Sequence, residues 1–130
     1  MDETNLFTGI EHVAIASKDP KALAKWYCDT LGFRIAYKSS RSLTTFVKLR
    51  ESLLEIIEAS NAERVVHEEK DPGLRHIAIN VTDIHEAYEN LKSKGVPLRS
   101  EPAEKDGVWT LFFRDPEDNL LHLIKRSKSL

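Results

Sequence analysis

Four polar side chains interrupt apolar, strand-like stretches of this 130-residue sequence. Two are histidines in nearly identical phrases, EHVAIASKD at 11–19 and RHIAINVTD at 75–83. The others are the glutamate of SLLEIIEAS and the histidine of DNLLHLIKR, so the four residues are His12, His76, Glu55 and His122. Burying an unpaired carboxylate is expensive, and Glu55 therefore needs a cation or a strong donor. One divalent metal ion held by imidazole and carboxylate ligands would satisfy all four side chains.

Each of these residues also has an ordinary structural explanation. A single strand histidine is more often a hydrogen-bonded core residue than a ligand, and Glu55 could lie on a solvated face or pair with Arg or Lys. The duplicated positions favour metal ligation over these explanations. By contrast, we expect His67, in a polar stretch, and His85, in the first turn of a predicted helix, to be surface residues.

The two histidine phrases belong to a duplicated unit, because the similarity continues through a helix and its end. In both copies an aspartate can cap an amphipathic helix, and a glycine stands where that helix would end. The aligned pairs are His12 with His76, Ala14 with Ala78, Ile15 with Ile79, Asp19 with Asp83 and, after one extra residue, Gly32 with Gly95.

Strand-like runs follow each helix and give the order β-α-β-β-β twice. The expected strands are 10–16, 33–38, 43–49 and 53–58 in the first unit, and 74–81, 97–100, 108–114 and 120–125 in the second. We expect one domain over residues 1–130, with module one at about 9–58, a polar linker at 59–72 and module two at about 73–126.

Successive side chains of a strand point to opposite faces of the sheet, so the candidate ligands are expected on the face away from the helices. The bulky β-branched side chains of the first strand share one face, which is the natural floor for an amphipathic helix. His12 shares the other face with Ala14 and Ala16, whose small side chains leave space in front of the imidazole. Glu55 and His122 each lie in the last strand of their unit, so they are counterparts in the same way.

The composition argues against several classes of partner. Nineteen basic and 21 acidic residues give a formal charge of −2, which provides no reason to propose nucleic acid or an anionic membrane. The one cysteine, Cys28, excludes an internal disulfide and is expected to be a structural thiol. No apolar run approaches the roughly 20 residues that span a bilayer, and the acidic N-terminus lacks a signal-peptide pattern. We therefore expect a cytoplasmic protein.

The chain resembles the vicinal oxygen chelate superfamily, which includes glyoxalase I, methylmalonyl-CoA epimerase, extradiol dioxygenases and bleomycin-binding proteins. The motifs that carry the resemblance are EHVAI, WYCDTLGF, LLEII, RHIAINVTD, KSKGV and FFRDPEDNLLHLI. It implies an α+β fold in which two β-α-β-β-β modules form an open, mostly antiparallel barrel around one divalent ion. Family ligands come from the first and last strands of each module, which correspond here to His12, Glu55, His76 and His122.

Two departures from the family pattern bear on the chemistry. The last motif usually contains Asp-Pro-x-Gly-Asn and then a glutamate ligand, but here Asp118 replaces the glycine and His122 replaces the glutamate. A divalent site with neutral imidazoles and one carboxylate carries about +1 by formal charge, which favours an anionic, oxygen-chelating substrate. The site also lacks one of the carboxylates that glyoxalase-type members use to move protons.

The resemblance implies a metal-dependent lyase or isomerase of the glyoxalase I or epimerase type. Such an enzyme chelates adjacent oxygens of a small carbonyl substrate and stabilises an enediolate, with Glu55 as the candidate catalytic base. Trp109, Arg114 and Tyr37 are candidates for the surroundings of the site. The metal could be Zn, Ni, Mn or Fe, and the family pattern implies a homodimer, with or without exchanged modules.

Other functions stay open on the sequence alone. A bleomycin-resistance-like protein binds a small molecule without turnover, although such members generally lack the ligand residues, and a metal-binding protein without turnover is a further alternative. An iron-dependent dioxygenase is less favoured, because its carboxylate ligand comes from the position that His122 occupies here. Fosfomycin-type thiol transfer is weaker still, for the same reason.

Overall fold

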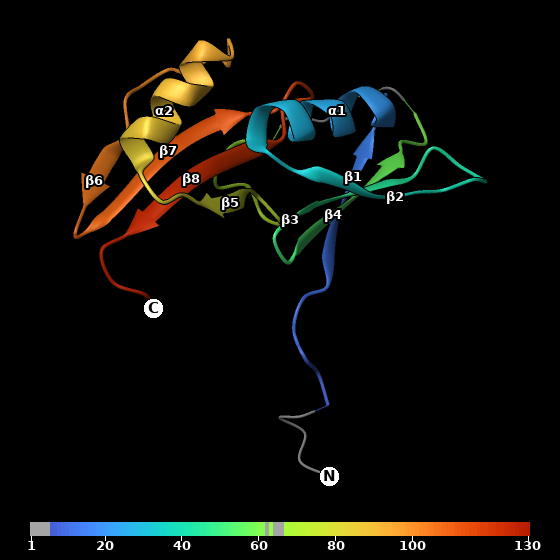
Figure 1. Ribbon diagram of the computed structural model, residues 1–130, viewed down its shortest axis with the longest axis horizontal. Helices are drawn as coiled ribbons and strands as arrows, with labels where there is room; N and C mark the ends of the chain where they lie inside the picture. Colours follow the sequence, from blue (N-terminus) through green and yellow to red (C-terminus); the bar gives the residue numbers. More distant parts are fainter. Residues whose placement is uncertain (1–5, 62, 64–66) are drawn as a thin grey trace. The chain divides into compact units, whose positions relative to one another are not determined.

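The computed structural model describes residues 6–61, 63 and 67–130, and the chain divides into two compact units, Met1–Glu63 and Arg64–Leu130. Each unit has the element order β-α-β-β-β (Figure 1). Each contains one four-stranded mixed sheet and one helix. The α+β class and the duplicated order of elements predicted from the sequence are therefore confirmed.

In the first unit, the first and last strands are neighbours in the sheet. The elements are β1 (His12–Ser17), α1 (Pro20–Leu31), β2 (Arg34–Lys38), β3 (Thr45–Leu49) and β4 (Ser52–Glu58). The spatial order is β1-β4-β3-β2. Strands β1 and β4 pair in parallel, and the other two pairs are antiparallel.

The second unit repeats this topology. Its elements are β5 (Ile77–Asn80), α2 (Ile84–Ser93), β6 (Ala103–Lys105), β7 (Val108–Arg114) and β8 (Leu120–Arg126). The spatial order is β5-β8-β7-β6, with a parallel pair between β5 and β8 and antiparallel pairs elsewhere. Both sheets are thus mostly antiparallel, with their single parallel pair at the same place.

Both helices begin at the aspartates that the sequence marks as caps. Asp19 Oδ1 accepts a hydrogen bond from the Ala22 backbone N–H at 3.1 Å, and Asp83 Oδ1 accepts one from His85 N–H at 3.0 Å. Helix α1 ends at Gly32, whose φ of 80° is a left-handed conformation that glycine adopts at little cost. Neither described helix has the length and apolar character needed to cross a bilayer.

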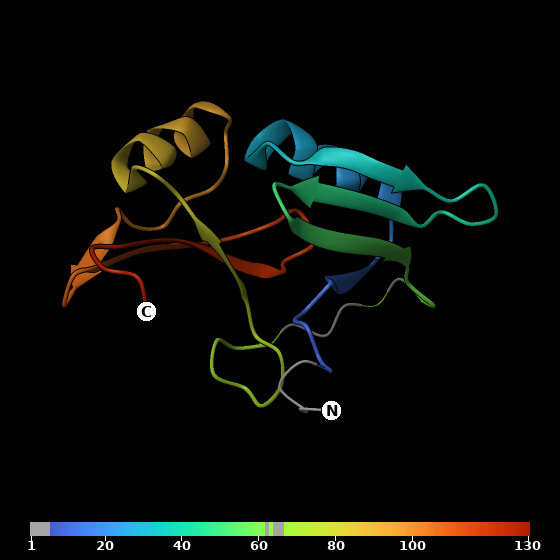
Figure 2. The ribbon, with the colours of Figure 1, turned by 60° about the horizontal axis from the view of Figure 1, so that its bottom comes forward.

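One face of each sheet packs against the helix of its own unit (Figure 2). In the first unit, the buried Val47 and Ile56 lie on this face, and the helix contributes the fully buried Tyr27. In the second unit, Leu111 and Leu121 are the corresponding buried residues. Because side chains alternate along a strand, the candidate ligands of β4 and β8 lie on the face away from the helix.

The structure corrects the predicted strand at 97–100, which is irregular backbone; the strand of this region is β6 at Ala103–Lys105. Pro97 has no N–H for a strand ladder. The overlooked signal is Asp106-Gly107, whose φ values of 53° and 80° form a two-residue hairpin turn between Lys105 and Val108. This turn fixes β6 as the strand directly before β7.

The first strands of both units also begin later than expected. His12 is the first residue of β1, and His76 lies directly before β5. Pairing with the last strand sets these starts, because the register begins at His12 with Leu53 and at Ile77 with Leu121. The residues before these positions have no ladder partner, so both histidines stand at the entrance to a strand rather than inside it.

The turn that leads into β8 is built around Asp115, which is only 3% exposed. Its Oδ1 accepts hydrogen bonds from the backbone N–H groups of Glu117 and Asn119 at 2.9 and 3.0 Å. Its Oδ2 accepts a third from Asn119 Nδ2 at 2.8 Å. Arg114 Nη1 donates to the carbonyl oxygen of Asp118 at 2.7 Å. These bonds hold the end of β7 and the start of β8 together.

We predict that Asp115→Ala lowers the free energy of unfolding by about 2–4 kcal/mol, because it leaves backbone N–H groups without partners at a buried position. Urea unfolding followed by circular dichroism measures this change. Glu89→Ala is the control, since Glu89 is exposed on α2 and its loss should change stability by less than about 0.5 kcal/mol. Equal stability of the two variants would contradict the role given to Asp115.

Candidate metal site

The first unit brings His12 and Glu55 together on one face of its sheet. Ala14 lies opposite Glu55 in the parallel register, so His12 is a diagonal neighbour of the glutamate on the adjacent strand. His12 Nε2 lies 3.4 Å from Glu55 Oε1. The Glu55 side chain is 25% exposed and that of His12 is 38% exposed, so the pair is accessible to a ligand.

The second ring nitrogen of His12 also faces a carboxylate. His12 Nδ1 lies 2.5 Å from Glu11 Oε1. This hydrogen bond raises the pKa of His12 above its ordinary value, and the charge of Glu55 adds to the rise. With an acid group at each nitrogen, the imidazole is in an environment that favours a cation, either as a proton on the ring or bound beside it.

The second unit brings His76 and His122 together in the corresponding place. Ala78 lies opposite His122 in the parallel register, as Ala14 lies opposite Glu55 in the first unit. The two imidazole rings have centroids 4.5 Å apart and are almost perpendicular, at 89°. Each unit therefore places a side chain from the start of its first strand beside one from its last strand.

His122 is buried, with 6% of its surface exposed. Its Nδ1 has no hydrogen-bond partner among the described residues. Burial lowers the pKa of His122 below its ordinary value, and nearby His76 adds to the decrease. The ring is thus held neutral, which is the protonation state that a metal ligand needs, and an unsatisfied buried polar atom costs about 1–3 kcal/mol.

Two phenylalanines that the sequence reasoning missed lie beside these pairs. Phe46 is opposite Glu55 in the register, and Phe112 is opposite His122. The ring centroids of His12 and Phe46 are 5.6 Å apart, and Phe112 stacks on His122 at 4.5 Å. The duplicated positions of the two phenylalanines, each two residues before a basic residue, were a signal that could have identified them.

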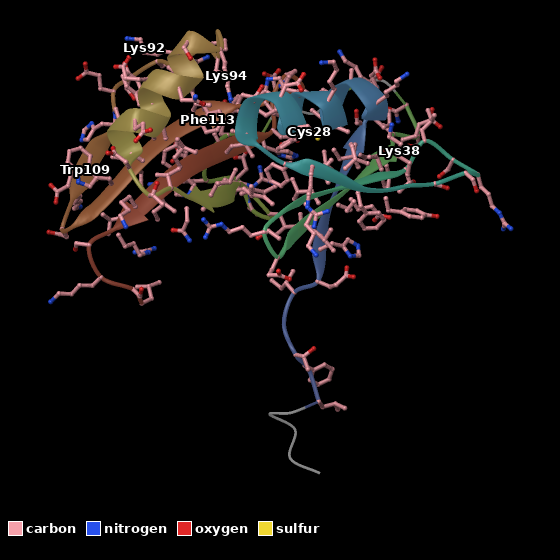
Figure 3. All side chains as sticks on the ribbon, viewed as in Figure 1. Cys28, Lys38, Lys92, Lys94, Trp109 and Phe113 are labelled. Carbon is pink, nitrogen blue, oxygen red and sulfur yellow. The ribbon has the colours of Figure 1, made fainter. Side chains whose placement is uncertain are left out.

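The three residues named as candidate surroundings of the site lie in different places. Tyr37 makes an edge contact with Phe46, at 6.2 Å between ring centroids, on the face of the candidate pair. Arg114 is bound to the carbonyl oxygen of Asp118 in the turn before β8. Trp109 and Phe112 point to opposite faces of β7. Because Phe112 lies on the face of the candidate ligands, Trp109 lies on the helix side of the sheet (Figure 3).

Trp109 packs on His85 of α2, with ring centroids 4.7 Å apart. His85 and His67 are both exposed, as expected from the sequence. Cys28 is half-buried on α1 (Figure 3), and burial raises the pKa of its thiol, in agreement with a structural role.

The candidate ligands thus form one pair in each unit. In the described part of either unit, no three His, Cys, Asp or Glu side chains are grouped as a complete metal site. Two side chains provide fewer protein ligands than a structural or catalytic zinc site contains. Neither pair on its own is therefore a complete metal site.

Residues 9–123 match the family described as the Glyoxalase/Bleomycin resistance protein/Dioxygenase superfamily, and the chain belongs to this superfamily. The resemblance inferred from the sequence motifs is therefore confirmed.

Similar proteins cover almost the whole chain. It is 28% identical over 129 residues to a Bacillus subtilis (strain 168) protein described as "Uncharacterized protein YwkD", a match that covers 93% of this chain and 99% of that protein. It is also 28% identical over 123 residues to a Synechocystis protein named "Probable lactoylglutathione lyase", covering 89% and 94% of the two chains. A glyoxalase family protein from Enterococcus faecalis superposes with a TM-score of 0.77 at 29% identity, over 92% of this chain and 99% of that one.

We predict that His122→Leu raises the free energy of unfolding of the metal-free protein by about 1 kcal/mol at neutral pH, since it removes a buried polar atom that has no partner. The pH dependence should change as well. The pKa of His122 is lower in the folded protein than in the unfolded chain, so the unfolded chain takes up the proton first as the pH falls. The wild type should therefore lose stability relative to His122→Leu as the pH falls below about 6.5, the ordinary pKa of histidine.

Denaturant unfolding of the wild type and His122→Leu, with a chelator present, measures both effects. The stability difference between the two proteins should widen from pH 7.5 to pH 5.5, roughly the range in which an ordinary histidine titrates. A constant difference would contradict a lowered pKa for His122.

Proposed function

We propose that this chain is a metal-dependent lyase or isomerase of the glyoxalase I or epimerase type, with one divalent ion held by His12, Glu55, His76 and His122. The observation that carries the proposal is the repetition of the pair. In each unit the histidine at the start of the first strand lies beside a candidate ligand of the last strand. The proposal requires the two pairs to serve the same ion.

The chemistry of the donor set fits such an ion. Neutral imidazole and carboxylate are common ligands of Zn, Ni, Mn and Fe. His12 Nε2 and Glu55 Oε1 are 3.4 Å apart, and the buried Nδ1 of His122 has no hydrogen-bond partner in the described chain. A cation held by these residues would balance the carboxylate charge and offset the cost of burying the His122 imidazole.

The ion, when bound, would supply Lewis-acid polarisation of two adjacent substrate oxygens. Glu55 is the candidate catalytic base, because it is the one carboxylate of the proposed set and its side chain is partly exposed. The His12 imidazole lies beside this carboxylate. Phe46, directly opposite Glu55 in the sheet, places an apolar side chain beside it.

His122 in place of a carboxylate changes the expected chemistry. A second neutral imidazole in the second pair leaves Glu55 as the one acidic member of the proposed set. The proposed reaction therefore uses a single carboxylate base rather than two, and the more positive site favours a substrate whose chelating oxygens carry negative charge. The 28% identity to a protein named probable lactoylglutathione lyase supports the reaction class without identifying the substrate.

Elemental analysis of protein purified without a histidine tag is expected to find about one Zn, Ni, Mn or Fe per chain. His122→Ala removes one of the proposed donors and should weaken metal binding by roughly tenfold or more. His85→Ala is the matched control, because His85 is an exposed histidine of the same unit whose ring packs on Trp109. Absence of metal after reconstitution, or equal affinities of both variants, would overturn the proposed site and favour a small-molecule binder without metal.

Glu55→Gln should lower turnover by about 10²–10⁴-fold at a saturating concentration of metal, because the amide keeps an oxygen donor but cannot accept the proton. Suitable substrates are α-hydroxycarbonyl compounds, thiohemiacetals and acyl-CoA thioesters, with proton exchange at carbon followed by NMR in D₂O. Glu58→Gln, an exposed glutamate on the same strand, is the control and should keep full activity. A wild type that holds metal but exchanges no proton on any of these substrates would indicate a binding protein.

A further inference from the structure

We infer that Glu11 is a positioning residue for the proposed metal centre, because it holds the proton of His12 on Nδ1 and leaves Nε2, the nitrogen on the Glu55 side, as the one that can bind a metal ion. His12 Nδ1 lies 2.5 Å from Glu11 Oε1, a short hydrogen bond. Nε2 lies 3.4 Å from Glu55 Oε1. Glu11 is therefore on the side of the ring opposite to the candidate site.

The physical reason is the tautomerism of the ring. A neutral imidazole carries one proton, on either nitrogen, and only the other nitrogen can donate a lone pair to a metal. A carboxylate is an acceptor only, so Glu11 can bond to Nδ1 only when Nδ1 carries the proton. Glu55 is also an acceptor, but its 3.4 Å contact with Nε2 is longer than the 2.5 Å contact of Glu11 with Nδ1, so the proton is favoured on Nδ1. A histidine that donates its second N–H to a carboxylate in this way is also a more basic ligand, and loss of such a partner typically weakens metal binding 10–100-fold.

The second unit shows that this arrangement is not a general consequence of the fold. At the position equivalent to Glu11 it has Arg75, whose Nε donates to the carbonyl oxygen of Gly73 at 3.4 Å. An arginine has no acceptor and cannot fix the tautomer of the adjacent His76. The orientation by a neighbouring carboxylate is thus particular to the first unit, which also contributes the one carboxylate of the proposed donor set.

The contact contributes little to folding stability. The side chain of Glu11 is 76% exposed and that of His12 is 38% exposed, so solvent weakens the pair. If Glu11 had a purely structural role, its replacement would therefore have no measurable effect on folding stability. A positioning role predicts changes in the tautomer of His12 and in metal affinity instead.

The first measurement uses metal-free, ¹⁵N-labelled protein at a pH where the ring is neutral. Two-bond ¹H–¹⁵N correlation spectra should show His12 mainly with its proton on Nδ1 in the wild type. Glu11→Ala should shift the population toward the proton on Nε2, while Glu11→Gln, whose amide oxygen can still accept the bond, should largely preserve the wild-type tautomer. An unchanged tautomer in Glu11→Ala overturns the inference.

The second measurement is the dissociation constant of Zn²⁺ by competition with a chelator. Glu11→Ala should weaken binding roughly 10–100-fold, with partial recovery in Glu11→Gln. Glu58→Gln removes an equal charge from the same unit, and Arg75→Ala changes the equivalent position of the second; both should stay close to wild type. If Glu11→Ala and Glu58→Gln weaken Zn²⁺ binding equally, the loss of a negative charge alone explains the effect of Glu11. That result would overturn its positioning role.

The expected effect of Glu11 on metal affinity rests on the proposed metal site. The inference and the proposed function can nevertheless fail separately. A wild type that binds no metal overturns the proposed function, and the spectra of the metal-free protein then decide the orientation of His12 by Glu11. A wild type that binds metal with the same affinity as Glu11→Ala leaves the proposed function intact and removes Glu11 from it.

Discussion

The parallel pairing of the first and last strands within each unit is the constraint on which the candidate site depends. Parallel strands cannot be joined by a tight turn, so a helix and two further strands lie between them in the chain. The register places Ala14 opposite Glu55 and Ala78 opposite His122. A slip of one residue would turn Glu55 or His122 toward the helix and into the apolar core, at a large cost in free energy.

The two pairs share a geometry but differ in their electrostatics. In the first unit, carboxylates of Glu11 and Glu55 face both nitrogens of an accessible imidazole, an arrangement that favours a bound cation. In the second, His122 is buried against Phe112 and its lowered pKa keeps it neutral. On the proposed function, the first pair would contribute most of the attraction for the ion, and the second would contribute neutral nitrogen donors that favour a transition metal over calcium or magnesium.

The duplicated phrases and the alternation of apolar residues were sufficient to predict the order of elements and the faces of the last strands. Strand starts could not be predicted in the same way, because they depend on where pairing with a distant strand begins, as at His12 with Leu53. Phe46 and Phe112 were not among the predicted site residues, and the register shows that they lie beside the candidate ligands. The site of four residues stays a prediction, since the structure gives two pairs.

Asp118, which stands at the family's glycine position, can be explained by the conformation of its turn without any role in the proposed reaction. Its φ of 66° lies in the left-handed region, which Asp tolerates better than most residues. Three hydrogen bonds from the turn to the Asp115 carboxylate, and one from Arg114 to the Asp118 carbonyl, hold this conformation. The turn can therefore place β8 in its register without the glycine. Of the two departures from the family motif, only the histidine at 122 falls within the proposed donor set, so the difference in expected reactivity depends on that residue.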